Sequence, residues 1–499
     1  MRSVPRRRLV AGLLLAPLLS GCFASSGGET SSSASADGAR LRVALAFPPA
    51  ENLSPYGADA TILSRLGVTE GLTALDANGT AIPALAESWT RENDRSWLFT
   101  LREATFQDGT DVTPSAVATA LTRAAEAKVV PAALTGVELT AKAAGDDRIR
   151  VATADPDPVL PLRLAGPGLA VLSTKAYAKQ GAVSPVGTAT GPFELTAATG
   201  TTTATLDRFE DYWGGRAQAS GIDAKFIADG AARTNALRTG EVDLAEAVPV
   251  SQAATLDQGT ARETATTRTT SLYLNAESGP FKDARVRAAA RAAVDTSVLA
   301  EGVYEGRADP GAGIFGPAVT WAEGKRVTPA DRTKATDPDG TSVTLATYDN
   351  RPELPEAAQV LKQQLEKAGF KVKLEVREYA RLESDVLAGK FDAFVSARNT
   401  MLDTGDPVSI LASDYTCDGG YNLALLCDQQ VDKAVDLAAS ASDTEKRQDA
   451  AMAAEAEILG TDAVVPLVHQ RVMTGVAPSV RGVLLDPYER RLVGTGTRA

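Results

Sequence analysis

Alternating hydrophobic and polar residues predict short β-strands through the first half of the chain. These runs lie at 41–47, 97–101, 148–152, 204–209 and 224–227. Thr113 and Pro114 predict the start of a helix, because a threonine side chain can cap the first turn and proline has no N–H to leave unpaired there. We therefore expect a mixed α+β structure in this half.

The second half alternates between the strand pattern and the helix pattern. Strands are expected at 342–348, 371–376 and 391–395, with helices at 353–368 and 382–388 between them. Gly369 predicts the end of the first of these helices, since glycine readily adopts the left-handed conformation found there. The order strand, helix, strand, helix, strand predicts parallel strands joined by right-handed crossovers.

A further helix and strand are predicted near the carboxyl end. Residues 442–445 (Ser-Asp-Thr-Glu) have the sequence of a capping box, which would open a helix running to about Leu459. Residues 464–468 have the composition of a strand. No repeat of fixed length is present, which argues against a solenoid. The whole pattern indicates two α/β lobes joined by crossing segments.

The amino terminus has the features of an export signal. Four arginines precede an apolar run at 9–19, which is shorter than the roughly 20 residues of a membrane-spanning helix. The run ends in Leu19-Ser20-Gly21-Cys22, which resembles a bacterial lipobox; an ordinary secretory signal with an accidental cysteine is the alternative. We expect 1–21 to be a lipoprotein signal peptide and lipidated Cys22 to anchor an extracytoplasmic protein to the outer face of the cytoplasmic membrane. A weak likeness to a twin-arginine signal leaves the export route open.

Composition narrows the function classes. The 499 residues carry a formal net charge of -12, which argues against a nucleic-acid partner because phosphate binding needs an excess of Lys and Arg. A single histidine excludes metal sites and mechanisms that need two imidazoles, and we expect no metal and no cofactor. Once Cys22 is modified, Cys417 and Cys427 remain, an even pair expected to form a disulfide outside the cytoplasm; two free thiols are the alternative.

A series of short motifs then runs through the chain in a fixed order. The motifs are EGLTALD at 70–76, PALAESW at 83–89, WLFTLR at 97–102, FQDG at 106–109, VGTATGPF at 186–193, DYWGG at 211–215, GEVD at 240–243, LN at 274–275 with PFKDARVR at 280–287, AVD at 293–295, and DTGDP at 403–407. In this order they resemble the family 5 extracellular solute-binding proteins, the receptors of bacterial ABC importers for oligopeptides, dipeptides and nickel. The likeness extends from about residue 41 to the end.

The resemblance implies a fold and an organisation. The fold is α/β (α+β), a two-lobe periplasmic-binding-protein-like architecture of the large class, with an extra subdomain in lobe I and a hinge between the lobes. The expected boundaries are a Ser/Gly-rich tether at 22–39, lobe I at 40–82, 179–267 and 474–499, the extra subdomain at 83–178, and lobe II at 268–473. The resemblance also implies a monomer that is not an enzyme, binds peptides between its lobes, and delivers them to an ABC permease and ATPase complex.

Ligand-binding residues follow from the same resemblance. In peptide-binding members the aspartate four residues before the proline of the last motif receives the ligand's α-ammonium group, and that position is Asp403. A buried cation needs such a partner because it loses its hydration. The family usually has tryptophan where this chain has Thr400, which implies an altered pocket wall. Tyr421 and Asn422 match a family segment near the cleft. The cation for a ligand carboxylate stays open among Arg351, Arg381 and Arg398.

Other functions leave weaker traces. An oligosaccharide ligand would need aromatic platforms, and Trp321 is the tryptophan outside the family motifs. Nickel is disfavoured because the family's nickel members use histidine, and His469 lies in an apolar run away from the ligand motifs. An exported hydrolase would depend on the same histidine, yet the chain has no G-x-S-x-G motif and no serine with lysine three residues on.

Overall fold

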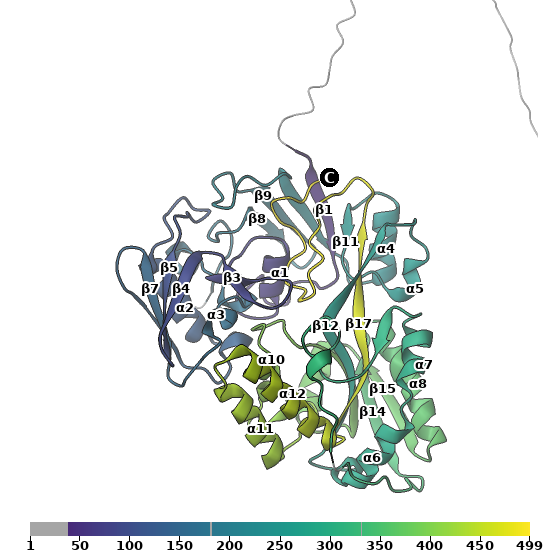
Figure 1. Ribbon diagram of the computed structural model, residues 1–499. Helices are drawn as coiled ribbons and strands as arrows, with labels where there is room; N and C mark the ends of the chain where they lie inside the picture. Colours follow the sequence, from purple (N-terminus) through teal and green to yellow (C-terminus); the bar gives the residue numbers. More distant parts are fainter. Residues whose placement is uncertain (1–37, 180–181, 331) are drawn as a thin grey trace, which may run out of the picture. The chain divides into compact units, whose positions relative to one another are not determined.

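The computed structural model describes residues 38–179, 182–330 and 332–499 (Figure 1). The predicted signal peptide, the lipidation site Cys22 and nearly all of the predicted tether lie outside these residues. No helix in the described ranges is long and apolar enough to cross a membrane.

The central feature of the described chain is one sheet of eleven strands that runs through both lobes. Its order is β15-β14-β16-β12-β17-β11-β1-β10-β9-β8, with β13 paired to β17. The strands are β1 (Arg40–Leu45), β8 (Phe193–Thr199), β9 (Thr203–Arg208), β10 (Gly221–Phe226), β11 (Leu244–Ala245), β12 (Ala261–Leu274), β13 (Ala308–Pro310), β14 (Ser342–Tyr348), β15 (Lys371–Arg377), β16 (Ala393–Asn399) and β17 (Val464–Val476).

Lobe I is built on β1 and its parallel neighbours β10 and β11. The alternation that predicted β1 is its burial pattern, since Leu41 and Val43 are fully buried while Arg42 between them is exposed. Helices α1 (Asp59–Arg65), α4 (Gly230–Arg238) and α5 (Val250–Ala253) accompany these strands. Residues of α4, β11 and α5 share a hydrophobic cluster with lobe II, so the two lobes do not have fully separate cores.

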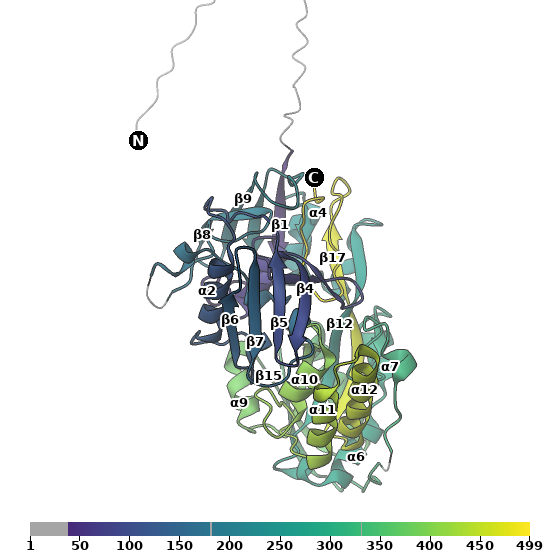
Figure 2. The same ribbon diagram turned by 60° about the vertical axis from the view of Figure 1, so that its left-hand side comes forward.

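The extra subdomain has its own sheet and its own hydrophobic cluster. Four strands of the described chain form it in the order β4-β5-β7-β6: β4 (Ala86–Asn93), β5 (Ser96–Leu101), β6 (Leu139–Ala143) and β7 (Arg148–Thr153), which face the viewer in Figure 2. Helix α2 (Pro114–Ala125) packs on β6 and begins as predicted, with the Thr113 side chain accepting from the Ala116 N–H. A short hairpin, β2 (Thr73–Leu75) with β3 (Ala81–Pro83), and helix α3 (Leu160–Arg163) complete this region.

Lobe II confirms the predicted crossovers. β14 pairs in parallel with both β15 and β16, and helices α8 (Glu353–Lys367) and α9 (Glu383–Leu387) connect them. Helix α8 ends as expected, because Gly369 takes a φ of +108° directly after the cap residue Ala368. Helices α6 (Ala284–Ala293) and α7 (Thr296–Val298) lie earlier in the chain of this lobe.

The two long strands β12 and β17 cross from one lobe to the other side by side (Figure 1). β17 extends to Val476, beyond the predicted 464–468, because its second half pairs with β12 and β11. Helices α10 (Pro407–Tyr415), α11 (Gln429–Ser440) and α12 (Thr444–Gly460) pack together beside them. The predicted capping box was wrong by one residue, since Asp443 and not Ser442 caps α12 by accepting from the Lys446 N–H.

Candidate ligand-binding site

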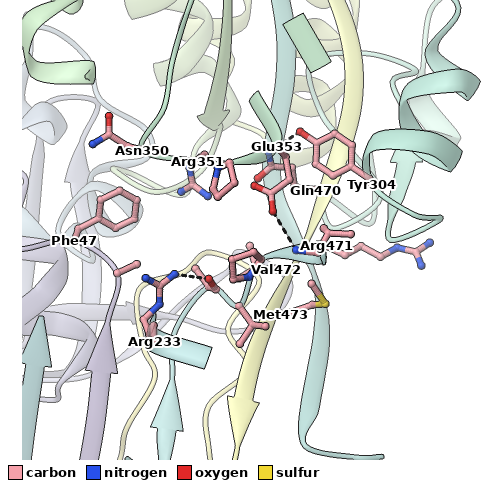
Figure 3. A pocket seen from close by; sticks show the side chains of 16 residues that line it. Phe47, Arg233, Tyr304, Asn350, Arg351, Glu353, Gln470, Arg471, Val472 and Met473 are labelled. Atoms are coloured by element: carbon pink, nitrogen blue, oxygen red, sulfur yellow. Dashed lines mark hydrogen bonds between the residues drawn. The ribbon is translucent and has the colours of Figure 1, made fainter. Parts of the chain in front are cut away.

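The carboxyl ends of the parallel strands of both lobes meet beside the crossing strands. In open α/β sheets this is where ligands bind. Two adjoining cavities lie there, each enclosing about 530 Å³ of space that is partly open to solvent. Both are lined by Phe47 after β1, Ala247 after β11, Arg351 after β14 and Val472 on β17. The first cavity, shown in Figure 3, also contains Glu353 and Tyr304, and the second contains Arg65, Glu489 and Arg491.

Arg351 projects from lobe II toward lobe I. Its guanidinium carbon lies 5.5 Å from the centroid of the Phe47 ring, which remains 37% exposed (Figure 3). Across the described chain, no hydrogen bond or ion pair is made to the Arg351 side chain. The nearby Arg233 differs, because its guanidinium donates to the carbonyl oxygens of Ile227, Glu246 and Ala247 at 2.6 Å each. Arg351 therefore has a free donor surface in the cleft.

A dense charge cluster forms the floor of the second cavity. Arg268 donates to both carboxylate oxygens of Glu489, at 2.9 and 3.1 Å, and Asn399 donates to one of them at 3.1 Å. Arg65 pairs with Glu246 at 2.5 Å. Burial alone would raise the pKa of Glu489, but the charges of Arg268, Arg65 and Arg351 lower it to about 2. Glu489 is therefore ionised at every physiological pH.

Hydrogen bonds across the cleft hold the two lobes against each other. The Glu353 carboxylate at the start of α8 accepts from the Val250 N–H of α5 at 3.1 Å (Figure 3). On the opposite side, Arg490 donates to the Ala165 carbonyl at 3.0 Å and to the Met401 carbonyl at 2.9 Å. The Glu353–Val250 and Arg490–Met401 bonds join the two predicted lobes, and the Arg490–Ala165 bond joins the carboxyl-terminal segment of lobe I to the extra subdomain.

Asp403 lies on the loop between β16 and α10, against the extra subdomain. A side chain at Gly166 would lie 2.4 Å from the Asp403 carbonyl oxygen, so the two backbones are in close contact. The Asp403 carboxylate is half-buried and accepts no hydrogen bond from any described residue. Burial raises its pKa, and the charges of Arg398 and Arg490 partly oppose that rise. Asp406 on the same loop is instead ion-paired with Arg447, which donates to it at 2.8 and 2.6 Å.

The disulfide loop carries the other two predicted ligand residues. Cys417 and Cys427 are bonded, as the even pair predicted. The Asn422 amide donates to the Thr416 and Leu426 carbonyls and accepts from the Leu426 N–H, so it stabilises this loop. Tyr421 is half-buried, with its hydroxyl against that of Tyr379 and its ring 4.1 Å from the Arg398 guanidinium carbon. The Tyr421 ring therefore lies on the Arg398 guanidinium, while Asn422 acts within the loop. None of the three predicted ligand residues, Asp403, Tyr421 and Asn422, lines either of the two cavities.

The three arginines that were candidates for binding a ligand carboxylate have different surroundings. Arg398 is bound by both carboxylate oxygens of the fully buried Asp414, at 2.7 and 3.1 Å. The Arg381 side chain is 86% exposed and lies outside both cavities. Arg351 lines both cavities. Thr400 is buried and donates to the Thr267 carbonyl at 3.0 Å, so its hydroxyl binds the crossing strand β12.

Trp321 and His469, the residues on which the alternative functions would depend, both pack within the protein. The Trp321 ring packs on Phe315, with centroids 6.2 Å apart. His469 is buried; its Nδ1 lies 2.9 Å from the Thr269 hydroxyl and its Nε2 accepts from the Ala312 N–H at 3.1 Å. Within 38–179, 182–330 and 332–499, no group of three or more His, Cys, Asp or Glu side chains is arranged to hold a metal ion.

Several cleft residues were not found from sequence. Phe47 had a signal, because an aromatic residue ends the first predicted strand and two prolines follow it. No sequence signal marks Glu489 and Arg491. They lie near the carboxyl terminus and reach the cleft only because the last segment folds back onto lobe I.

Two α/β lobes with a polar cleft, joined by crossing strands, define a solute-binding protein of the periplasmic type. The model of the bacterial extracellular solute-binding proteins, family 5 (middle), matches residues 80–422, and the chain belongs to that family. It is therefore the substrate-binding component of an ABC importer, in a family of extracellular solute-binding proteins.

Individual relatives bind different solutes. The glutathione-binding protein GsiB of Escherichia coli strain K12 is 26% identical over 465 residues, covering 87% of this chain and 90% of that one. NikA from Staphylococcus aureus, solved with Ni(L-His)2, has a TM-score of 0.79 at 22% identity and covers 92% of this chain and 100% of its own. OppA from Haemophilus influenzae, solved with the peptide RPPGFSPFR, has a TM-score of 0.77 at 20% identity over 93% and 99%. These structures share the fold, and the ligand is a separate question.

Proposed function

We propose that this protein captures short peptides between its lobes and delivers them to an ABC permease and ATPase complex. The observation that carries the proposal is the Asp403 carboxylate, which is half-buried without a partner among the described residues. A carboxylate that has lost part of its hydration without gaining a partner is costly, and a ligand ammonium group would offset that cost. The relative GsiB binds glutathione, itself a peptide, which supports this class of solute.

Arg351 is proposed to bind the carboxylate at the other end of the peptide. A guanidinium recognises a carboxylate through two parallel hydrogen bonds, and Arg351 has no competing partner in the described chain. β14 and β16 are adjacent in the sheet, and Arg351 and Asp403 follow their respective carboxyl ends. A peptide lying along this edge of the sheet would meet Asp403 at its amino end and Arg351 at its carboxyl end.

The remaining parts of the proposal concern the cleft wall and the anchor. Tyr421 would form part of the wall, and the disulfide together with Asn422 would hold its loop in place. Lipidated Cys22 would tether the monomeric protein to the outer face of the cytoplasmic membrane, with 22–39 as the tether. The lobe boundaries stay as the family resemblance implies, although the hydrophobic cluster of lobe II also takes in residues of α4, β11 and α5.

Calorimetric titration of the purified protein with pools of di- to hexapeptides tests this function. We expect saturable binding that Asp403→Asn abolishes, because the amide cannot neutralise an ammonium group. Asp418→Asn is the matched control, since Asp418 is exposed on the disulfide loop. Unchanged peptide binding in Asp403→Asn would remove Asp403 as the anchor, and no binding to any peptide in the unchanged chain would remove the peptide class.

A further inference from the structure

The second cavity is lined from both lobes and contains more positive than negative groups that are free to act. Arg65, Leu485 and Arg491 come from lobe I, Arg351 comes from lobe II, and Thr264 comes from the crossing strand β12. The Thr264 hydroxyl is buried and makes no hydrogen bond within the described residues.

Every carboxylate in this cavity is already occupied. Glu246 accepts from Arg65 and from the Ala46 N–H, and Glu489 accepts from Arg268. Asp486 accepts from three backbone N–H groups, those of Tyr488, Arg490 and Arg491.

The charged side chains of this cavity that have no polar partner among the described residues are those of Arg351 and Arg491. Neither makes a side-chain hydrogen bond or an ion pair with any described residue, although both line this one cavity. They belong to opposite lobes: Arg351 follows β14, and Arg491 lies in the carboxyl-terminal segment after β17.

The charge of Arg351 also acts on neighbouring arginines. Burial lowers the pKa of Arg268 and of Arg233, and the charge of Arg351 lowers both further. Like charges that approach across a partly dry cavity repel one another, and an anion placed between them converts the repulsion into attraction.

We propose that the second cavity is an anion subsite between Arg351 and Arg491 of opposite lobes: a peptide whose terminal carboxylate is bound by Arg351 gains a contact with Arg491 when it carries an additional carboxylate, and such peptides are preferred. The inference rests on the proposed function for the peptide frame, with Asp403 on the ammonium group. The subsite also links recognition to closure, because an anion that contacts both lobes binds the closed form more tightly than the open one. Solutes without the second acid lose this coupling.

The test uses two dipeptides of matched size, Ala-Gln and Ala-Glu, with the smaller Ala-Ala as a reference, titrated calorimetrically into the full chain. We expect Ala-Glu to bind at least about tenfold more tightly than Ala-Gln, the range of a charge-assisted contact. Arg491→Gln should erase that difference. Arg262→Gln is the matched control, since Arg262 is an exposed arginine outside this cavity.

Glutarate separates the subsite from the peptide function. It carries two carboxylates and no ammonium group, so its binding should survive Asp403→Asn and disappear in Arg491→Gln. That result supports the anion subsite even if no dipeptide binds, which would remove only the proposed peptide class. Equal affinities for Ala-Glu and Ala-Gln in the unchanged chain, or a preference for Ala-Glu that survives Arg491→Gln, would overturn the subsite.

Discussion

Two aspartates three residues apart on the loop after β16 have opposite surroundings. Asp406 is 2% exposed and ion-paired with Arg447, whereas Asp403 has no partner in the described part of the chain. An ion pair of this kind is costly to break from one side, because the other charge is left buried. An unpaired carboxylate whose pKa is raised by burial costs stability in its ionised form.

The two positions should therefore respond oppositely to the same change at neutral pH. Asp406→Asn should lower the free energy of unfolding by about 3 to 5 kcal/mol, since it leaves the Arg447 guanidinium without its charge partner. Asp403→Asn should leave the stability equal or slightly raised while removing peptide binding. Urea denaturation at pH 7 measures both. A loss of stability in Asp403→Asn as large as that in Asp406→Asn would show that Asp403 is structural.

His469 makes the stability depend on pH. Its pKa is lowered to about 4, chiefly by burial and also by the charge of Arg326, while Asp309 opposes the shift. The unfolded chain takes up a proton below a pH of about 6.5 and the folded chain only near 4, so stability falls as the pH falls between these values.

We expect His469 to contribute a loss of about 3 kcal/mol in the free energy of unfolding between pH 7 and pH 4. Urea denaturation at several pH values measures it, with His469→Gln as the comparison because glutamine does not titrate. The unchanged protein should lose more stability than the variant over this range. Parallel curves for the two proteins would contradict the assignment.

At the scale of elements, the sequence pattern predicted the features that depend on neighbouring residues, namely the order of strands and helices and the helix caps. The crossovers of β14, β15 and β16 and the caps at Thr113 and Gly369 followed from side-chain periodicity and backbone preference. The length of β17 did not, because its second half is a strand only through pairing with β12 and β11. The cleft behaves likewise: the family motif points to Asp403, which lines neither cavity, whereas the grouping of Phe47, Arg351 and Arg491 depends on the topology of the whole sheet.

The disulfide loop is an element whose worth can be measured. Cys417 and Cys427 are 10 residues apart, and closing so short a loop should stabilise the protein by about 3 kcal/mol through the entropy of the unfolded chain. The double variant Cys417→Ser/Cys427→Ser should melt earlier by a corresponding amount. Its peptide affinity should also fall, since the loop that presents Tyr421 gains freedom. Unchanged affinity at lower stability would show that Tyr421 lies outside the ligand contact surface.

At the scale of the whole molecule, the lobes are connected by strands, by a shared hydrophobic cluster and by polar bonds across the cleft, among them those of Arg268 and Asn399 with Glu489. β12 and β17 form a continuous pair through both lobes, so opening must bend this pair. The contact between Glu353 and the Val250 N–H lies beside the first cavity and closes the lobes without being part of either proposed charge site.

Glu353→Ala should therefore weaken the closed form without changing the ligand contacts. A bond between a carboxylate and a backbone N–H contributes about 1.5 kcal/mol, so the affinity for every peptide should fall by one common factor of up to about tenfold. Small-angle scattering measures the closure of the lobes. At saturating peptide the variant should be as compact as the unchanged protein, and at subsaturating peptide it should be less compact. A common factor distinguishes this lobe contact from Arg491, whose substitution should affect acidic peptides alone. If Glu353→Ala instead changed the ranking of the peptides, Glu353 would be a ligand contact, and the closure of the lobes would depend on the ligand and the Arg490 bonds.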